Sequence, residues 1–144
     1  MKINNVVVIG SGTMGSGIAA QLCNANIPVT LLDLKTEISQ KAKERIEKSR
    51  PPLLIDKSKI DGIKVGNIND DFNIVSEADW IVEAVVERID IKHDIYDKIF
   101  KQRKKGSIVS SNTSSIPISV LSEKLTEDDK KDFCITHFFL SLIH

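Results

Sequence analysis

The sequence has little cysteine: Cys23 and Cys134 are its two thiols, and their wide separation matches no metal-binding spacing. We therefore expect no metal site, and we interpret both cysteines as buried thiols of a reducing compartment. The start of the sequence also lacks an apolar run long enough for a signal peptide or a membrane span. These absences predict a cytoplasmic protein with no membrane partner.

The sequence also has no net charge, because 20 Lys and Arg residues balance 20 Asp and Glu residues. A chain without a global positive field gives no reason to expect a nucleic-acid partner. The dense basic run KQRKK, at 101–105, is interpreted as the end of a helix, where positive side chains suit the helix dipole.

What the sequence does have is material for a core: 41% of its 144 residues are hydrophobic and 28% are charged, which suits one globular domain over 1–144. Continuous apolar runs rich in β-branched residues are typical of strands buried on both faces of a parallel sheet. Such strands are predicted at residues 6–10, 27–33, 63–68, 79–86, 106–112 and 132–139. Because helical segments alternate with them, we predict an α/β fold, a Rossmann-type doubly wound parallel sheet in a single domain.

The motif GSGTMG follows the first predicted strand and opens a helical stretch, which is the context that a dinucleotide-binding G-x-G-x-x-G motif requires. Gly10 permits a tight turn, Gly12 has no Cβ to keep a pyrophosphate from the backbone, and Gly15 lets the helix pack close to the strand. The N–H groups at the start of the helix would face the phosphates. The predicted cofactor-binding turn comprises Gly10, Ser11, Gly12, Thr13, Met14 and Gly15.

Asp33 supplies the second half of this signal, because it ends the second predicted strand. A carboxylate there accepts hydrogen bonds from the adenosine ribose hydroxyls and repels the 2′-phosphate of NADP. The next residue is Leu34 and not an arginine, so NAD is the expected cofactor. An acid in this place can also be a solvated loop or helix-cap residue, but the glycine spacing favours dinucleotide binding. These observations leave the reaction open.

Three later stretches narrow the choice of reaction: EAVVERIDIKHDIY at 83–96, SSNTSSIPIS at 110–119 and THFF at 136–139. Together with GSGTMGSGIA at 10–19, they resemble the NAD-binding domain of the L-3-hydroxyacyl-CoA dehydrogenases. These are enzymes of fatty-acid β-oxidation and their 3-hydroxybutyryl-CoA relatives. The resemblance covers nearly the whole chain and depends on four separate motifs in the right order.

This resemblance implies the NAD-dependent oxidation of an L-3-hydroxyacyl-CoA substrate to the 3-oxoacyl-CoA. It places Glu87 and Lys92 beside the nicotinamide half of the cofactor, and Ser114 near both nicotinamide and substrate. It places His137 on the catalytic histidine, and Ser49 on a position that touches coenzyme A. Without the resemblance, Glu87 and Lys92 would be interpreted as a solvated charge pair, and Ser114 as a loop or cap serine.

The residue types at these positions suit the chemistry. When hydride leaves the substrate carbon, the hydroxyl proton must leave as well, and a histidine takes it readily because its pKa is near neutral pH. Ser114 can hydrogen-bond the substrate oxygen or the nicotinamide amide and so orient the two reactants. A lone histidine near a strand end is usually structural, so the catalytic assignment of His137 depends on the other motifs.

The end of the sequence departs from the family pattern. Leu140 stands where the family has an asparagine that helps to build the nicotinamide site, and the helical second domain of the family does not follow. We interpret the stretch from about 140 as divergent, through an interrupted reading frame or a shortened chain, with the C-terminal helical domain absent. That domain normally supplies the carboxylate that orients the histidine, so we expect weak or no activity from the chain alone.

The alternative hypothesis is a non-catalytic NAD-binding remnant of a truncated dehydrogenase. A different G-x-G-x-M-G dehydrogenase, such as a β-hydroxyacid type, is disfavoured by the stretches SNTSS and THFF. Apolar residues near the end would lack their natural cover, and we expect them to favour self-association. They are Phe138, Phe139, Leu140, Leu142 and Ile143.

Overall fold

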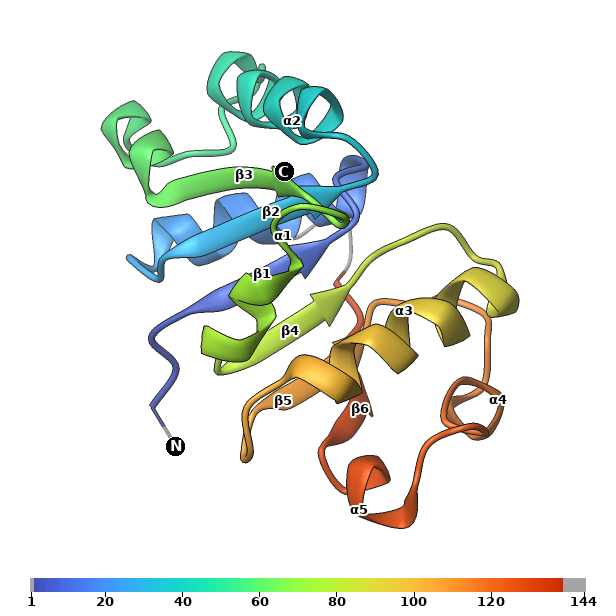
Figure 1. Ribbon diagram of the computed structural model, residues 1–144. Helices are drawn as coiled ribbons and strands as arrows, with labels where there is room; N and C mark the ends of the chain where they lie inside the picture. The colour runs from blue at the N-terminus through green and yellow to red at the C-terminus, as the bar shows by residue number, and fades with distance from the viewer. Residues whose placement is uncertain (1, 139–144) are drawn as a thin grey trace.

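The structure, a computed structural model, describes residues 2–138, which form a six-stranded sheet with helices on both faces (Figure 1). Each neighbouring pair of strands is parallel, in the order β3-β2-β1-β4-β5-β6. The strands are β1 (Val6–Ile9), β2 (Val29–Asp33), β3 (Ile63–Asn67), β4 (Trp80–Glu83), β5 (Ile108–Ser111) and β6 (Phe133–Ile135). The predicted Rossmann-type doubly wound sheet is thus confirmed, with a strand at each of the six predicted places.

The observed strands are shorter than the predicted ones, chiefly at their carboxyl ends. Strand β4 ends at Glu83, whereas the apolar run continues through Val85 and Val86, which lie in the loop before the next helix. Strand β6 likewise ends at Ile135. Val85 and Val86 line a cleft beyond the sheet, so their apolar character does not require a strand.

Helices follow the strands and return the chain across the sheet. The helices are α1 (Thr13–Asn24), α2 (Thr36–Lys48), α3 (Ile89–Gln102), α4 (Ile118–Leu121) and α5 (Glu127–Lys130), with short 3₁₀ segments η1 (Lys57–Gly62) and η2 (Phe72–Glu77). Helix α2 stops at Ser49, because Pro51 lacks an N–H and its ring disfavours a helical backbone in the residue before it. Helix α3 ends within the predicted basic run, with Lys101 in its last turn.

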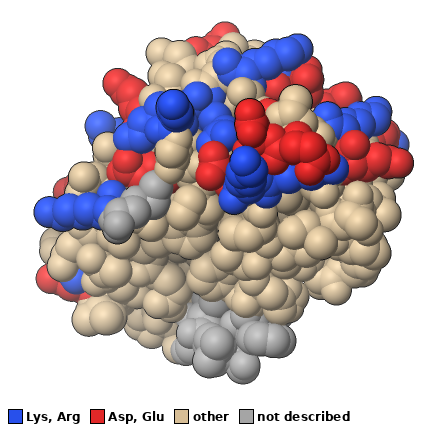
Figure 2. Space-filling model, turned by 90° about the horizontal axis from the view of Figure 1, so that it is seen from below, with Lys and Arg blue, Asp and Glu red and all other residues tan. Residues whose placement is uncertain are grey.

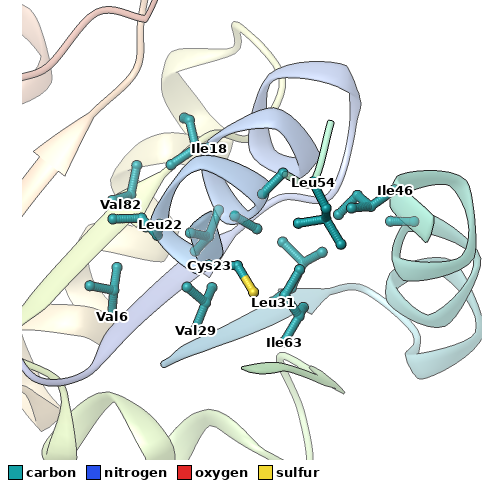
Figure 3. Close-up of a cluster of buried hydrophobic side chains, with 14 residues drawn as sticks. Val6, Ile18, Leu22, Cys23, Val29, Leu31, Ile46, Leu54, Ile63 and Val82 are labelled. Carbon is teal, nitrogen blue, oxygen red and sulfur yellow. The ribbon is translucent and has the colours of Figure 1, made fainter. Parts of the chain in front are cut away.

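Two apolar clusters, one on each face of the sheet, hold the layers together. Successive residues of a strand point to opposite faces, so Val8 joins one cluster and Ile9 the other. Figure 3 shows the first cluster, in which Ile18 of α1 and Ile46 of α2 lie against the strands. The second cluster includes Ile99 of α3 and residues of η2. Burial of this apolar surface is the main term that stabilises the fold.

Helices α1 and α3 leave neighbouring central strands on opposite faces of the sheet (Figure 1). Strands β1 and β4 pair with each other, and the Ala84 N–H extends their ladder by donating to the Ile9 carbonyl at 2.7 Å. Where connections diverge in this way, they leave room beyond the carboxyl ends of the strands, and doubly wound proteins bind ligands there. The fold therefore places the candidate site after β1, β4 and their neighbours.

Charged side chains of both signs are mixed on the face shown in Figure 2, and a broad part of that face carries no Lys, Arg, Asp or Glu. Within residues 2–138, no helix is long and apolar enough to cross a membrane. Both cysteines are free thiols whose pKa burial raises, but Cys134 is only partly buried, unlike Cys23. The predicted self-association surface from Phe139 onwards lies outside the described residues.

Candidate active-site groove

The turn between β1 and α1 uses its three glycines in different ways. Gly10 has a positive φ of 103°, and a side chain there would clash with the carbonyl group of Ala84. A side chain at Gly15 would clash with the carbonyl oxygen of Gly10. A Cβ at Gly12, by contrast, would meet no heavy atom within 4 Å. Packing within the protein explains two of the glycines, and the open space beside Gly12 fits a ligand.

The amino end of α1 is suited to an anion. None of the described side chains caps its first turn, and Gly12, Thr13 and Met14 line a cleft of about 700 Å³. Uncapped N–H groups and the positive end of the helix dipole attract negative charge, so a pyrophosphate fits this position.

Asp33, at the end of β2, lines the same cleft and also braces the glycine turn. Its Oδ2 accepts hydrogen bonds from the Ser11 N–H at 2.8 Å and from Ser11 Oγ at 2.5 Å, and its Oδ1 accepts from the Leu34 N–H at 2.7 Å. A carboxylate oxygen has two lone pairs, so Oδ1 keeps the capacity to accept from a ribose hydroxyl. The structure thus brings Asp33 directly against the predicted cofactor-binding turn.

Arg45 is a cleft residue that the sequence did not single out. From α2, its Nη2 donates to the Ser11 carbonyl at 3.0 Å, and its side chain lines the cleft together with Asp33 and Leu34. The available signal was a basic residue in the last turn of a helix, which is a common and uninformative feature. No arginine follows Asp33 in the sequence, but the structure places an arginine, Arg45, in the same cleft.

A second cleft, of about 390 Å³, continues the first one. It brings together Met14 of the predicted turn with three further predicted site residues, Glu87, Ser114 and His137, from segments that are far apart in the sequence. The residues that line both clefts are Met14, Ala84 and Val85. The two clefts therefore form one groove, which runs from Asp33 to His137.

His137 follows β6 and lies exposed at this groove. Its Nδ1 is 3.3 Å from the Thr113 carbonyl oxygen, and the next residue, Phe138, donates its N–H to Asn112 Oδ1 at 3.1 Å. Both contacts fasten the segment after β6 to the loop after β5. When Nδ1 carries the proton and donates it to Thr113, the basic lone pair of the ring lies on Nε2.

Glu87 and Lys92 are not the solvated charge pair that their spacing alone would suggest. The Lys92 side chain is 1% exposed, and its Nζ lies 3.1 Å from Glu87 Oε1 and 2.6 Å from Glu83 Oε2. Glu83 is the last residue of β4 and is fully buried. Lys92 lines neither cleft. It acts on the groove through its ion pair with Glu87, which lines the second cleft.

Glu87 is a firmly anchored carboxylate at the groove. Burial alone would raise its pKa, but hydrogen bonds from Thr113 Oγ1 at 2.7 Å and Ser115 Oγ at 2.8 Å, together with the Lys92 ammonium, lower that pKa to about 2. The Ser114 N–H also lies 3.4 Å from its Oε2. Glu87 therefore remains ionised at neutral pH and holds the loop that carries Ser114.

Glu83, Tyr96 and Ser111 form the buried side of this cluster, and the sequence did not single them out. Glu83 Oε1 accepts from Tyr96 OH at 2.5 Å and from Ser111 Oγ at 2.6 Å. Burial, together with the neighbouring Glu83 charge, raises the pKa of Tyr96, so the phenol keeps its proton and acts as a donor. The available signal was a carboxylate at the end of the apolar run WIVE, where an unpaired charge would be costly.

Ser49 is not brought to the groove. Its Oγ donates to the Ile46 carbonyl at 3.0 Å and accepts from the Leu53 N–H at 2.9 Å, which closes α2 locally. Ser49 lines neither cleft, and its contact with coenzyme A stays a prediction. In the part of the chain that the structure describes, no group of three or more His, Cys, Asp or Glu side chains could hold a metal ion.

Comparison with known proteins gives matches to one family in sequence. The family model for the NAD binding domain of 3-hydroxyacyl-CoA dehydrogenase matches residues 5–141. A probable 3-hydroxyacyl-CoA dehydrogenase of Deinococcus radiodurans is 42% identical over 146 residues, which cover 96% of this chain and 42% of the relative. Another, from Bacillus subtilis, is 39% identical over 158 residues, which cover 95% of this chain and 20% of the relative.

The fold is similar to solved structures as well. The dehydrogenase part of a multifunctional enzyme from C. elegans matches with a TM-score of 0.83 at 29% sequence identity, over 99% of this chain and 33% of that chain. The chain therefore spans less than half the length of each of these three relatives.

Two glycine variants should separate folding from cofactor binding. Gly15→Ala must displace the Gly10 backbone, so it should lower the free energy of unfolding by about 1–3 kcal/mol. Gly12→Ala has room for its methyl group and should cost less than about 1 kcal/mol, yet it should weaken NADH binding because the methyl group fills the space that fits a pyrophosphate. Urea unfolding and NADH fluorescence titration measure the two effects. Equal destabilisation by both variants would show that Gly12 is a packing glycine.

Glu87→Gln should alter the pH dependence of stability in the direction set by the lowered pKa. The ionised carboxylate stabilises the folded protein fully above its ordinary pKa of 4.5, and this contribution is lost as the pH falls towards about 2. The wild type should therefore be more stable than the variant near neutral pH, and the difference should shrink between these two pH values. Urea unfolding over a pH series measures it, with Glu77→Gln as the control for loss of an exposed charge. A difference that does not vary with pH would contradict this role.

Proposed function

The chain belongs to the family of 3-hydroxyacyl-CoA dehydrogenase NAD-binding domains, and from this premise we propose a function for its groove. The groove binds NAD(H) and serves the oxidation of an L-3-hydroxyacyl-CoA to the 3-oxoacyl-CoA, in fatty-acid β-oxidation or butanoate metabolism. The observation that carries the proposal is the continuity of the groove from Asp33 to Glu87, Ser114 and His137. Because the chain spans less than half of the Deinococcus and Bacillus relatives, the activity of the whole protein is part of the proposal.

The adenosine and pyrophosphate half of NAD fits the cleft around Asp33. Asp33 Oδ1 can accept a hydrogen bond from a ribose hydroxyl, and Gly12 leaves space for the diphosphate at the uncapped end of α1. Arg45 adds a positive charge to the same cleft, which suits the two phosphates. Leu34 and Ile38 are exposed apolar side chains of the lining and suit the adenine ring.

NAD supplies the hydride acceptor, and residues of the second cleft handle the proton and the orientation of the reactants. His137 accepts the hydroxyl proton at Nε2, while the Thr113 carbonyl oxygen holds Nδ1–H. Ser114 hydrogen-bonds the substrate oxygen or the nicotinamide amide. Glu87, braced by Lys92, lies on the nicotinamide side and fixes the loop that carries Ser114.

An acyl-CoA substrate and a cytoplasmic location complete the proposal. The names of the relatives specify 3-hydroxyacyl-CoA compounds, and we extend that substrate class to this chain. Cys23 and Cys134 are free thiols, which suits a reducing compartment. A role in NAD binding without turnover is the competing hypothesis, and the activity measurement described below distinguishes the two.

Asp33→Ala should weaken NADH binding by about 1.5–3 kcal/mol, because it removes charged hydrogen bonds to the ribose. The wild type should bind NADPH much more weakly than NADH, and the variant should lose most of this preference, since no carboxylate then repels the 2′-phosphate. Calorimetric titration with both cofactors measures this, with Asp61→Ala in η1 as the control. Equal affinity of the wild type for NADH and NADPH would overturn the assignment and implicate Arg45 in binding the 2′-phosphate.

The catalytic assignment is tested with acetoacetyl-CoA and NADH, by following NADH absorbance. We expect the purified chain to oxidise NADH slowly or not at all by itself, and a separately produced C-terminal part of the Deinococcus relative to raise the rate. His137→Ala should reduce the raised rate by about 10²–10⁴-fold, the usual contribution of a general base. His93→Ala, on α3 and away from the groove, is the control.

Two outcomes would change this view of the chain. Rapid NADH oxidation by the chain alone, abolished in the His137 variant, would show that the groove is complete without further parts. NADH binding with no turnover, with or without the added part, would favour the binding-only hypothesis.

A further inference from the structure

A buried carboxylate ends the central strand β4 beside the groove, and the proposed reaction gives it no direct part. Glu83 is fully buried, and four donors surround its two oxygens. Oε1 accepts from Tyr96 OH at 2.5 Å and Ser111 Oγ at 2.6 Å, whereas Oε2 accepts from Lys92 Nζ at 2.6 Å and the Val85 N–H at 2.8 Å. These donors come from three different segments of the chain, so Glu83 ties β4, α3 and β5 together at their carboxyl side.

Lys92 is held from both sides by negative charge. Its Nζ lies 2.6 Å from Glu83 and 3.1 Å from Glu87, and the Val85 carbonyl oxygen is 3.4 Å away. A lysine side chain has many rotamers and no fixed fork of donors, so a single partner would leave its position poorly defined. The second carboxylate, at the inner end, is what gives the ammonium one fixed place beneath Glu87.

The same chain of contacts continues from Glu87 to the surface of the groove. Glu87 Oε2 accepts from Thr113 Oγ1 at 2.7 Å and Ser115 Oγ at 2.8 Å, so it holds both sides of Ser114. The Thr113 carbonyl oxygen in turn contacts His137 Nδ1 at 3.3 Å. Contacts thus run without interruption from the buried end of β4 to the proposed base.

We propose that Glu83 is a positioning residue for the nicotinamide end of the groove, acting through Lys92 on Glu87 and the loop that carries Ser114. This inference rests on the proposed function, because it needs the nicotinamide to lie at that end. A buried ion pair is weak evidence for stability, since well-packed apolar side chains often stabilise a core as well or better. Geometry is the better reason for this pair, because Lys92 also contacts Glu87, which lines the groove.

Strand β4 carries a matched comparison just before its other end. Asp79 accepts from Lys104 Nζ and from the N–H groups of Asn4 and Asn5, at 2.8 and 3.0 Å for the two backbone bonds. This carboxylate–lysine pair is partly exposed, and neither member lines the groove. It fastens the amino-terminal segment to the sheet, which is a structural role. Asp79→Asn therefore controls for the loss of a carboxylate–lysine pair as such.

Glu83→Gln is the informative substitution, because glutamine has the same shape. Its amide can still bond Tyr96 and Ser111, whose hydroxyl groups both donate and accept. It cannot offer Lys92 a negative charge, so the ammonium keeps one charged partner and its fixed place is lost. Glu83 has no hydrogen bond to Asp33, Arg45 or the glycine turn, and its bond to the Val85 N–H is one that a glutamine oxygen can keep. The adenosine half of the groove should therefore be unaffected.

The experiment measures dissociation constants for NADH and for ADP, which reaches only the adenosine and diphosphate part of the groove. Glu83→Gln should weaken NADH about tenfold, the effect of losing one charge-assisted contact, and should leave ADP within about twofold. Asp79→Asn should change both constants equally or not at all. Tyr96→Phe keeps the buried charge, removes one of its supports and should give a smaller loss in the same direction, which provides a test if Glu83→Gln does not fold.

A double-variant cycle shows whether Glu83 acts through Lys92. Lys92→Met should weaken the binding of NADH more than that of ADP. Adding Glu83→Gln to it should cause no further selective loss, because Lys92, through which Glu83 acts, has already been removed. Thermal unfolding establishes that each variant is folded. Additive losses in the double variant would overturn the proposed route.

The outcomes also separate this inference from the function on which it rests. If Lys92→Met weakens NADH and ADP equally, the nicotinamide does not lie at this end, and both the proposed placement and the inference are wrong. If Lys92→Met is selective for NADH while Glu83→Gln and Tyr96→Phe are not, the proposed function stands and Glu83 is structural only.

Discussion

The close approach of the glycine turn to the end of β4 is the constraint on which the rest of the groove depends. Gly10 and Gly15 have no side chains because the carbonyl groups of Ala84 and Gly10 occupy the space. The contact between Gly10 and Ala84 joins the first βα unit to the second half of the sheet, at the point where α1 and α3 leave on opposite faces. Ala84 and Val85 consequently line both clefts, and the groove is continuous past the contact between Gly10 and Ala84. A bulkier turn would separate a phosphate site from a reaction site.

Each of the two clefts of this groove contains a carboxylate, Asp33 in the first and Glu87 in the second, and the two are supported in different ways. Asp33 is held by backbone and hydroxyl donors of the glycine turn and its own next residue, so its support comes from the adjoining βα unit. Glu87 is held by the loop after β5 and by a lysine that Glu83 fixes from behind. The first arrangement needs only β1, β2 and their turn. The second needs β4, β5 and α3 to be in place together, so it depends on packing between segments that are far apart in the sequence.

The buried cluster shows why a charged group can persist in the centre of an apolar sheet. Glu83, Lys92 and Tyr96 are almost fully buried, and within the described residues no buried side-chain nitrogen or oxygen lacks a hydrogen-bond partner. Removing one member would leave another uncompensated, which is far more costly than the pair itself is stabilising. Single substitutions in such a cluster are therefore costly, and the cluster keeps Glu87 in a fixed position at the groove.

The sequence by itself determined the strands, the glycine turn and the place of Asp33, because these follow from local apolar runs and from spacings of a few residues. The motif resemblance selected Glu87, Ser114 and His137, which the structure places along one cleft. Only the tertiary structure decided that Val85 and Val86 leave the sheet, that Arg45 enters the cleft beside Asp33, and that Ser49 stays away from the groove. It also revealed Glu83 as the partner of Lys92, Tyr96 and Ser111. The physical reason is that a buried polar group takes its hydrogen bonds from the donors that the packed helices and strands bring to it. Those donors are far apart along the chain, so no local sequence pattern predicts them.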